Sequence, residues 1–214
     1  MNLQASNENR PMKRKALVAV AVAVWTIASL ASNIVGIWLA VGSTSLLLGV
    51  LALRFDFESC RQLLRPKRRL IVLGVIVGGL MAVATHLMYP VFIGLVPQVT
   101  VDIADLYAAF RAPSVWVPIL FLGPVILGEE LVWRGVVQTE LSERFGTGQG
   151  VLLAAGFYTL VQVPVGSPVL LLTAFSCGLV WSALRASTRS LVSALVAHIL
   201  WDVAILLWLP IDVF

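Results

Sequence analysis

Two short stretches of an otherwise apolar chain contain residue types that can activate a water molecule. The first is GEELVWRG at residues 128–135, in which two adjacent glutamates precede an arginine. The second is HILWD at residues 198–202, in which a histidine and an aspartate have helical spacing. General acid–base hydrolysis needs a carboxylate that accepts a proton and an imidazole oriented by a second carboxylate. The two stretches therefore indicate hydrolysis.

Helical spacing predicts which of these side chains meet. Glu130 and Arg134 lie at i and i+4, so they share a helix face and are expected to form an ion pair. Glu129 points about 100° away from Glu130 on an ideal helix, which leaves it free for chemistry. His198 and Asp202 have the same i, i+4 spacing. Asp202 is expected to accept a hydrogen bond from one imidazole nitrogen and leave the other for chemistry.

The composition is that of a polytopic membrane protein, in which such charges are expensive. Of 214 residues, 59% are hydrophobic and 12% are charged, whereas soluble domains carry about 25% charged residues. A charge at the centre of a spanning helix costs about 2.5–3.5 kcal/mol on insertion scales. Glu129 and Arg134 would avoid this cost if they lay at the lipid headgroups, where charge is tolerated. In that alternative the pair has no catalytic role. His86 has no acidic neighbour at helical spacing and is expected to be structural.

Uncharged stretches predict the helices that must position these groups. A spanning helix needs about 20 apolar residues, so residues 16–53 fit two spans with a turn at Ser32, Asn33 and Gly36. The helix that carries the glutamates is expected to continue to Gly146. Further spans and a short surface helix within 98–112 complete the set, with the spans near residues 70–89, 114–133, 151–163, 169–184 and 191–209. The predicted fold is an all-α, polytopic integral membrane helical bundle with about seven transmembrane helices.

Basic residues predict the orientation of this bundle. With a cytoplasmic N-terminus, the loops 54–69, 134–149 and 185–190 are cytoplasmic as well. Every Lys and Arg except Arg111 then lies on the cytoplasmic side, which agrees with the positive-inside rule. The sequence thus predicts an integral protein of the plasma (inner) membrane. The basic excess reflects this topology and does not indicate a nucleic-acid partner.

The chain is expected to divide into four parts, and its cysteines add no further constraint. Cys60 and Cys177 lack CxxC spacing and indicate neither a disulfide framework nor a metal knuckle. The parts are a cytoplasmic tail (1–15), N-terminal helices and loops (16–111), a membrane core (112–208) and a C-terminal tail (209–214).

The two chemical stretches resemble motifs of a known membrane family. EELVWR is similar to the EExxxR motif of the CAAX-processing and bacteriocin-processing (CPBP) endopeptidases, which include the type II CAAX prenyl proteases. HILWD is similar to their last motif, HxxxN or HxxxD, and follows in the expected order. The resemblance covers about residues 112–208 and implies an intramembrane endopeptidase. Its partners would be the lipid bilayer and a substrate that is a peptide, a prenylated tail or a membrane-protein segment.

The middle motif of the family departs in this chain. Where members commonly have FxxxHxP, this sequence has YTLVQVP at 158–164, which puts Gln162 at the histidine position. Alignment from Phe157 places Val161 there instead, and either choice loses a histidine. A catalytic zinc usually has three protein ligands from His, Glu, Asp or Cys, and a glutamine amide is a weak zinc ligand. The divalent metal that some members use therefore stays an open question, and the pattern favours a metal-free mechanism.

The resemblance implies a role for each candidate catalytic residue. Glu129 would act as general base on a water, and His198 as a second acid–base or oxyanion group. Gln162 would donate an amide N–H to the developing oxyanion. Asp202 would orient His198.

Arg134 would anchor Glu130 on the same helix. Counted along the helices, Glu129 and His198 both lie in the cytoplasmic half of the membrane, with His198 about 11 Å from the start of its span. The two residues are expected to meet in a cavity open to the cytoplasm, near the cytoplasmic membrane face.

The change at Gln162 also supports a function of another class. A family member with weakened or lost catalysis would bind its partner without cleaving it, as a membrane immunity or scaffold protein. A small transporter agrees less well with the sequence, because the charges cluster toward one side of the membrane and form no path across it.

Overall fold

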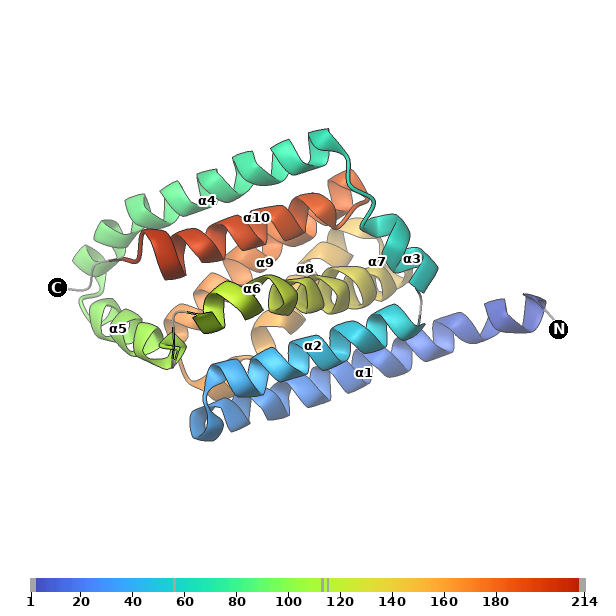
Figure 1. Cartoon of the computed structure of the whole chain (residues 1–214), viewed down its shortest axis with the longest axis horizontal. Helices are drawn as coiled ribbons and strands as arrows, with labels where there is room; N and C mark the ends of the chain where they lie inside the picture. Colours follow the sequence, from blue (N-terminus) through green and yellow to red (C-terminus); the bar gives the residue numbers. More distant parts are fainter. Residues whose placement is uncertain (1–2, 56, 113, 115, 212–214) are drawn as a thin grey trace.

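The computed structural model of the chain is a bundle of helices (Figure 1). It describes residues 3–55, 57–112, 114 and 116–211, with side chains from residue 14 onward. Within these residues every regular element is a helix, which confirms the predicted all-α fold. In chain order the elements are α1 (Leu3–Val35), α2 (Ile37–Phe55), α3 (Phe57–Leu63), α4 (Arg68–Leu95), α5 (Val99–Phe110), α6 (Trp116–Glu130), η1 (Leu131–Val137), α7 (Gln138–Phe145), α8 (Thr147–Leu160), η2 (Val163–Val165), α9 (Pro168–Thr188), α10 (Val192–Val203) and η3 (Ala204–Trp208).

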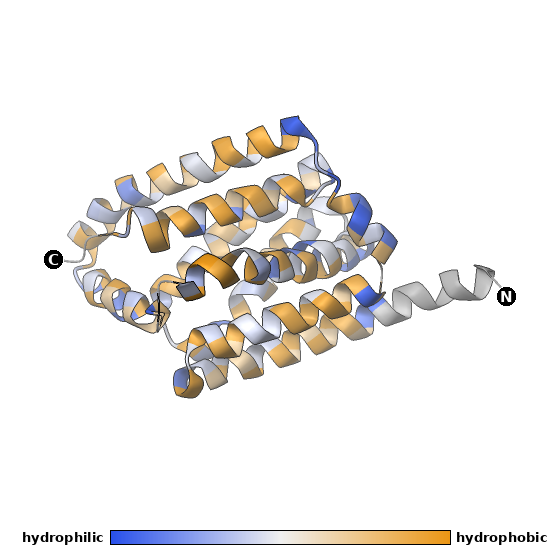
Figure 2. Ribbon diagram, viewed as in Figure 1, coloured by the Kyte–Doolittle hydropathy of each residue, from blue (hydrophilic) through white to orange (hydrophobic). Residues whose placement is uncertain are grey.

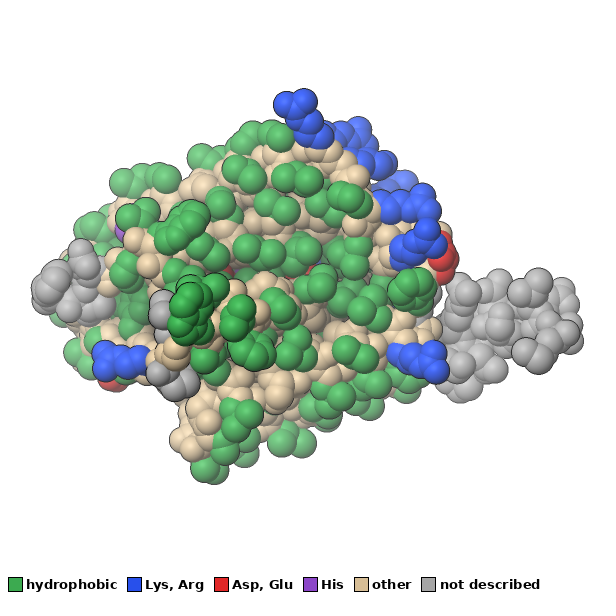
Figure 3. Space-filling view, viewed as in Figure 1, with side chains coloured by type: hydrophobic (Ala, Val, Ile, Leu, Met, Phe, Trp, Pro, Cys, Tyr) green, Lys and Arg blue, Asp and Glu red, His purple; other side chains and the backbone are tan. Residues whose placement is uncertain are grey.

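The long helices have the length and composition to cross a membrane. Besides these long helices, a shorter apolar helix lies at Val192–Trp208. Apolar residues predominate along the bundle (Figure 2), and hydrophobic side chains cover much of the face seen in Figure 3. The protein is therefore an integral membrane protein, as predicted. Within the described residues, the six longer candidate spans are 14–35, 37–55, 68–95, 116–145, 147–165 and 168–188.

Glycines end two helices at the predicted places. Gly36 separates α1 from α2 with φ +87°, and Gly146 ends α7 with φ +88°. Positive φ is a conformation that glycine adopts without a steric penalty. The expected tail at residues 1–15 is helical over the described part of that range, because α1 begins at Leu3. The expected tail at residues 209–214 lies partly outside the described residues.

The two ends of the bundle differ in charge. Basic side chains gather over α3 and the start of α4, at the right of Figure 3, and α5 lies at the other end of the molecule (Figure 1). Arg14 of α1 pairs with Glu140 and Glu143 of α7, and the Leu191 N–H before α10 donates to the Leu63 carbonyl of α3 at 2.9 Å. We call this charged end the basic end and the opposite one the α5 end.

Helices from the first half of the chain position those that carry the chemical groups. A Cβ added at Gly78 of α4 would lie 2.8 Å from the carbonyl oxygen of Ala197 in α10. A Cβ added at Gly49 of α2 would lie 2.7 Å from the Cα of Gly128 in α6. Small residues at such contacts let membrane helices approach closely. Residues 16–111 therefore set where the histidine and the glutamates lie.

Candidate active site

The first chemical stretch runs into a π-helical turn, and the second lies just before one. After Glu130 the helix widens into η1, where the Gln138 N–H bonds to the Trp133 carbonyl five positions earlier. After the histidine stretch it widens into η3, where the Leu209 N–H bonds to the Ala204 carbonyl at 2.8 Å. Such turns are rare and frequently occur at functional sites. The direction of a side chain beyond Glu130 or Val203 therefore cannot be counted along the helix at 3.6 residues per turn.

The two stretches meet at His198. Its Nδ1 lies 2.9 Å from Oε1 of Glu130, within hydrogen-bond distance. Its Nε2 lies 3.9 Å from Oε2 of Glu129 and 3.7 Å from Oδ1 of Asp202, and both distances are too long for a hydrogen bond. The histidine is 2% exposed. Its imidazole thus lies among carboxylates contributed by α6 and α10.

One detail of this contact differs from the sequence-based expectation. His198 is oriented by a hydrogen bond to Glu130 and not to Asp202, because the packing of α6 on α10 brings Glu130 to Nδ1. Glu129 lies beside the other nitrogen of the same imidazole, Nε2. An imidazole has two separate nitrogens, so one ring reaches both carboxylates.

Tyr158 binds Glu129 from a third helix, α8. Its hydroxyl donates a hydrogen bond to Oε2 of Glu129 at 2.9 Å. No role was predicted for Tyr158 from the sequence, where it only marks the aromatic position that aligns Gln162. The available signal was a tyrosine where the family commonly has phenylalanine, because the added hydroxyl is a hydrogen-bond donor.

Arg134 lies buried next to this cluster, with 1% of its surface exposed. Its Nη1 is 3.3 Å from Oε1 of Glu130, so the structure contains the ion pair that the spacing predicted. The guanidinium carbon also lies over the ring centroids of Tyr158 at 4.6 Å and Trp181 at 5.2 Å. The pair is therefore enclosed by protein side chains and aromatic rings.

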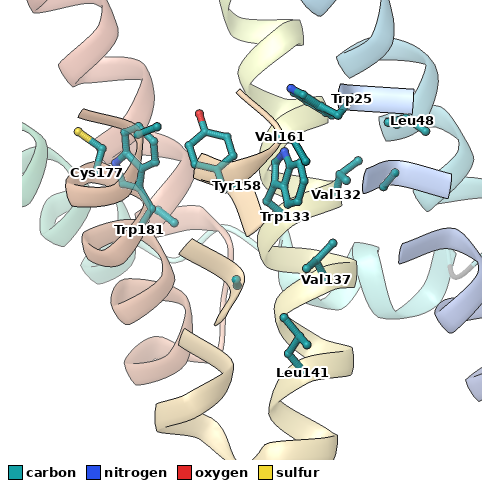
Figure 4. Close-up of a cluster of buried hydrophobic side chains, with 14 of the residues drawn as sticks. Trp25, Leu48, Val132, Trp133, Val137, Leu141, Tyr158, Val161, Cys177 and Trp181 are labelled. Carbon is teal, nitrogen blue, oxygen red and sulfur yellow. The ribbon is translucent and has the colours of Figure 1, made fainter. Parts of the chain in front are cut away.

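Trp181 of α9 forms the wall against which the imidazole packs. Its ring stacks on His198 with centroids 3.5 Å apart and 17° between the planes. Tyr158 lies edge-on to both Trp181 and Trp133 (Figure 4). This stacking holds the imidazole in one plane. No spacing in the sequence links Trp181 to His198, so only the folded chain identifies the contact.

Gln162 lies apart from the hydrogen-bonded cluster. Its Nε2 donates to the carbonyl of Tyr158, one turn back, at 3.0 Å. Among the described residues it makes no hydrogen bond to Glu129 or His198. It nevertheless lines the same cavity, of about 560 Å³, as Glu129, Tyr158, His198 and Asp202.

The position of this cavity also differs from the expectation. Its lining includes Phe92, Phe110, Val165 and Ile211, which lie toward the α5 end. The expected opening was toward the cytoplasm, inferred from the depth of His198 along its helix. The depth of a residue along its own helix does not tell on which side of the site other helices leave a cavity and on which side they fill the space.

The described residues contain no group of three or more His, Cys, Asp and Glu side chains placed to hold a metal ion. Of the two histidines in the chain, His86 instead lies 2.9 Å from the backbone carbonyls of Ala82 and Leu209. The Arg134 cation already compensates the carboxylate of Glu130. The site therefore does not fit a three-ligand catalytic zinc.

Fold and site together define a polytopic helical membrane protein with carboxylates and a histidine gathered in its interior. Residues 111–204 match the family model described as "Type II CAAX prenyl endopeptidase Rce1-like". This part of the chain is similar to that CAAX-protease-like family of membrane endopeptidases, which confirms the resemblance seen in the motifs. No curated protein and no solved structure matches the chain.

Proposed function

We propose that the protein is an intramembrane endopeptidase in which Glu129 activates a water molecule for attack on a peptide bond. The observation that carries the proposal is the placement of Oε2 of Glu129 and Nε2 of His198, 3.9 Å apart at the wall of one cavity. A peptide carbonyl that enters this cavity meets a carboxylate and an imidazole together. These are the two groups that a general acid–base hydrolysis uses.

The proposed reaction proceeds through a tetrahedral intermediate. Glu129 takes a proton from the water as the water oxygen bonds to the carbonyl carbon, and the carbonyl oxygen becomes an oxyanion. The protonated His198 donates its Nε2–H to this oxyanion and stabilises it. The proton held by Glu129 then passes to the amide nitrogen while the C–N bond breaks, which releases a carboxylic acid and an amine.

Three neighbours support the role proposed for His198. Glu130 accepts the Nδ1–H at 2.9 Å, so Nε2 is directed toward Glu129. Arg134 compensates the charge of Glu130 in a place that water does not reach. Trp181 fixes the plane of the ring by stacking. The imidazole is therefore preorganised before substrate binds.

Gln162 and Asp202 complete the proposed site from the cavity wall. An amide nitrogen carries two N–H donors, and Gln162 uses one of them on the Tyr158 carbonyl. The second is proposed to reach the developing oxyanion. Asp202, 3.7 Å from Nε2 of His198, is proposed to favour the protonated imidazole by charge attraction.

The general classes of partner follow from the family match and the fold. They are a lipid bilayer, which the apolar helices require, and a peptide substrate. The proposed location is the plasma membrane, with the basic end on the cytoplasmic side.

Replacing His198 with alanine is expected to lower the cleavage rate at least about 100-fold, because it removes the donor that faces the carbonyl oxygen. The measurement is hydrolysis of a quenched fluorescent peptide library by the purified protein in liposomes. His198→Gln serves as a second variant that retains most of the side-chain volume.

His86→Ala is the matched control for this experiment. His86 is the other histidine of the chain, it contacts backbone carbonyls, and it does not line the cavity. Its replacement is expected to leave the cleavage rate at the wild-type level. Wild-type cleavage by both His198 variants would show that the proposed site is not the catalytic one.

A second function, binding without cleavage as an immunity or scaffold protein, is favoured by Gln162 alone. At the position where the family has a histidine, this chain has an amide that is hydrogen-bonded within its own helix. The two functions make different predictions for Gln162→His.

Under the endopeptidase proposal, Gln162→His keeps cleavage within about tenfold of wild type, because a histidine N–H also donates to an oxyanion. The measurements are cleavage of the same peptide library and the metal content of both purified proteins by mass spectrometry. Cleavage or stoichiometric zinc that appears only in the variant would favour the binding function instead.

A further inference from the structure

The cavity occupies only the half of the bundle toward the α5 end. Along α9 it is lined from Val169 to Trp181, and on α10 from His198 onward. On α2 it is lined by residues from Ile37 to Gly42, at the start of that helix. Among the residues that the structure describes, none from α3, η1 or α7 lines it. The candidate site therefore lies at the inner end of a cavity that extends toward α5.

Packed side chains close the other side of the site. Between the cluster and the basic end lie Val137, Ser182, Leu191 and Ala194, each 0% exposed. They come from η1, from α9, and from the first residues of α10 together with the residue just before it. This layer separates the site from solvent at the basic end.

The charge distribution assigns a membrane side to each end. No Lys or Arg within the described residues lines the cavity. Excess Lys and Arg mark the cytoplasmic side of a membrane protein, so the cavity extends toward the opposite side. The described basic residues toward the basic end are Arg14, Lys15, Arg54, Arg61, Arg65, Lys67, Arg68, Arg69, Arg144, Arg185 and Arg189.

We propose that the substrate reaches the site from the α5 end, on the non-cytoplasmic side of the membrane, and is an apolar segment of a translocated peptide or membrane protein. This inference rests on the proposed endopeptidase function for its substrate. A cytoplasmic tail of a membrane-anchored protein would have to pass the packed layer at the basic end. A segment already on the far side enters the cavity directly.

The helix α5 forms the rim of this entrance. The Tyr107 hydroxyl donates to the Ile205 carbonyl and accepts from the Ile211 N–H, both at 2.9 Å. At the other end of α5, the Trp38 indole N–H donates to the Phe110 carbonyl at 2.9 Å. These bonds hold α5 beside η3 and the start of α2. The side chains that α5 presents to the cavity are mostly apolar, which favours an uncharged segment.

Two single cysteines on α9 test the direction of access. The background is Cys60→Ser with Cys177→Ser, which removes both native thiols. Ser176→Cys places a thiol at an exposed residue of the cavity lining. Ser187→Cys places one at an exposed residue of the same helix near the basic end, about 16 Å further along at about 1.5 Å per residue.

Sealed right-side-out and inside-out vesicles carrying each variant are treated with a membrane-impermeant methanethiosulfonate, and labelling after detergent gives the total. Ser176→Cys is expected to react in right-side-out vesicles, at least tenfold faster than in inside-out ones. Ser187→Cys is expected to show the reverse. Reaction of Ser176→Cys from the cytoplasmic side, from both sides equally, or from neither side would overturn the proposed entrance, as would labelling of Ser187→Cys from outside.

This labelling is independent of catalysis. The same pattern is expected in a background that also carries Glu129→Gln, because that variant keeps the shape of the cavity. Absence of cleavage by the protein that retains Glu129, together with the expected labelling pattern, would contradict the endopeptidase function alone. The opposite labelling pattern with normal cleavage would contradict the entrance alone.

Discussion

The Glu129→Gln variant is expected to cleave peptides about 10⁴-fold more slowly than the wild type, at the upper end of the effect of a general base. The amide has the shape of the carboxylate and still accepts the hydrogen bond from the Tyr158 hydroxyl. It cannot take a proton from water, so the nucleophile is not formed. The initial cleavage rate of the peptide library in liposomes is the measurement.

Two further variants make this expectation specific. Glu58→Gln changes an exposed acid of α3 that pairs with Arg61, and is expected to cleave at the wild-type rate. Tyr158→Phe removes only the donor to Glu129 and is expected to give a rate between those of the wild type and Glu129→Gln. A Glu129→Gln protein that cleaves as fast as Glu58→Gln would exclude Glu129 as the base.

The Arg134→Ala variant is expected to lose about 3–5 kcal/mol of unfolding free energy, because it leaves the carboxylate of Glu130 buried without a counter-charge. Both side chains of the pair are almost completely buried, at 1% and 0% exposure. The free energy of unfolding is measured by titration with sodium dodecyl sulfate in mixed micelles.

The exposed pair of Arg61 and Glu58, with 3.7 Å between its charged atoms, provides the control. Arg61→Ala is expected to cost less than about 1 kcal/mol, as exposed ion pairs do. The double variant Glu130→Gln with Arg134→Met removes both charges and is expected to recover part of the loss. A cost for Arg134→Ala no larger than that for Arg61→Ala would show that the buried pair contributes little to stability.

Much of the fold follows from local properties of the sequence. The apolar stretches predicted the spanning helices, and Gly36 and Gly146 predicted two of their ends. The short helix at Val99–Phe110 was also predicted. These features depend on residues adjacent in the chain, so the local amino-acid sequence is enough to predict them. The two π-helical turns were missed because the amino-acid pattern gives no sign of a change in helical repeat.

The site was predicted where its contacts lie within one helix. Glu130 and Arg134 pair at i and i+4 as their spacing required. The partner of His198 was missed, because Glu130 lies 68 positions earlier in the chain. The contributions of Tyr158 and Trp181 were missed for the same reason, since each comes from a different helix.

The sequence by itself determined that the chain crosses a membrane, that one helical segment carries GEELVWRG and another HILWD, and that residues 111–204 resemble the CAAX proteases. These properties are set by apolar length and by motif. Only the tertiary structure decided that Glu130 and not Asp202 binds Nδ1 of His198, and that the cavity extends toward α5. The physical reason is packing: close contacts such as Gly78 against Ala197 fix how distant helices meet.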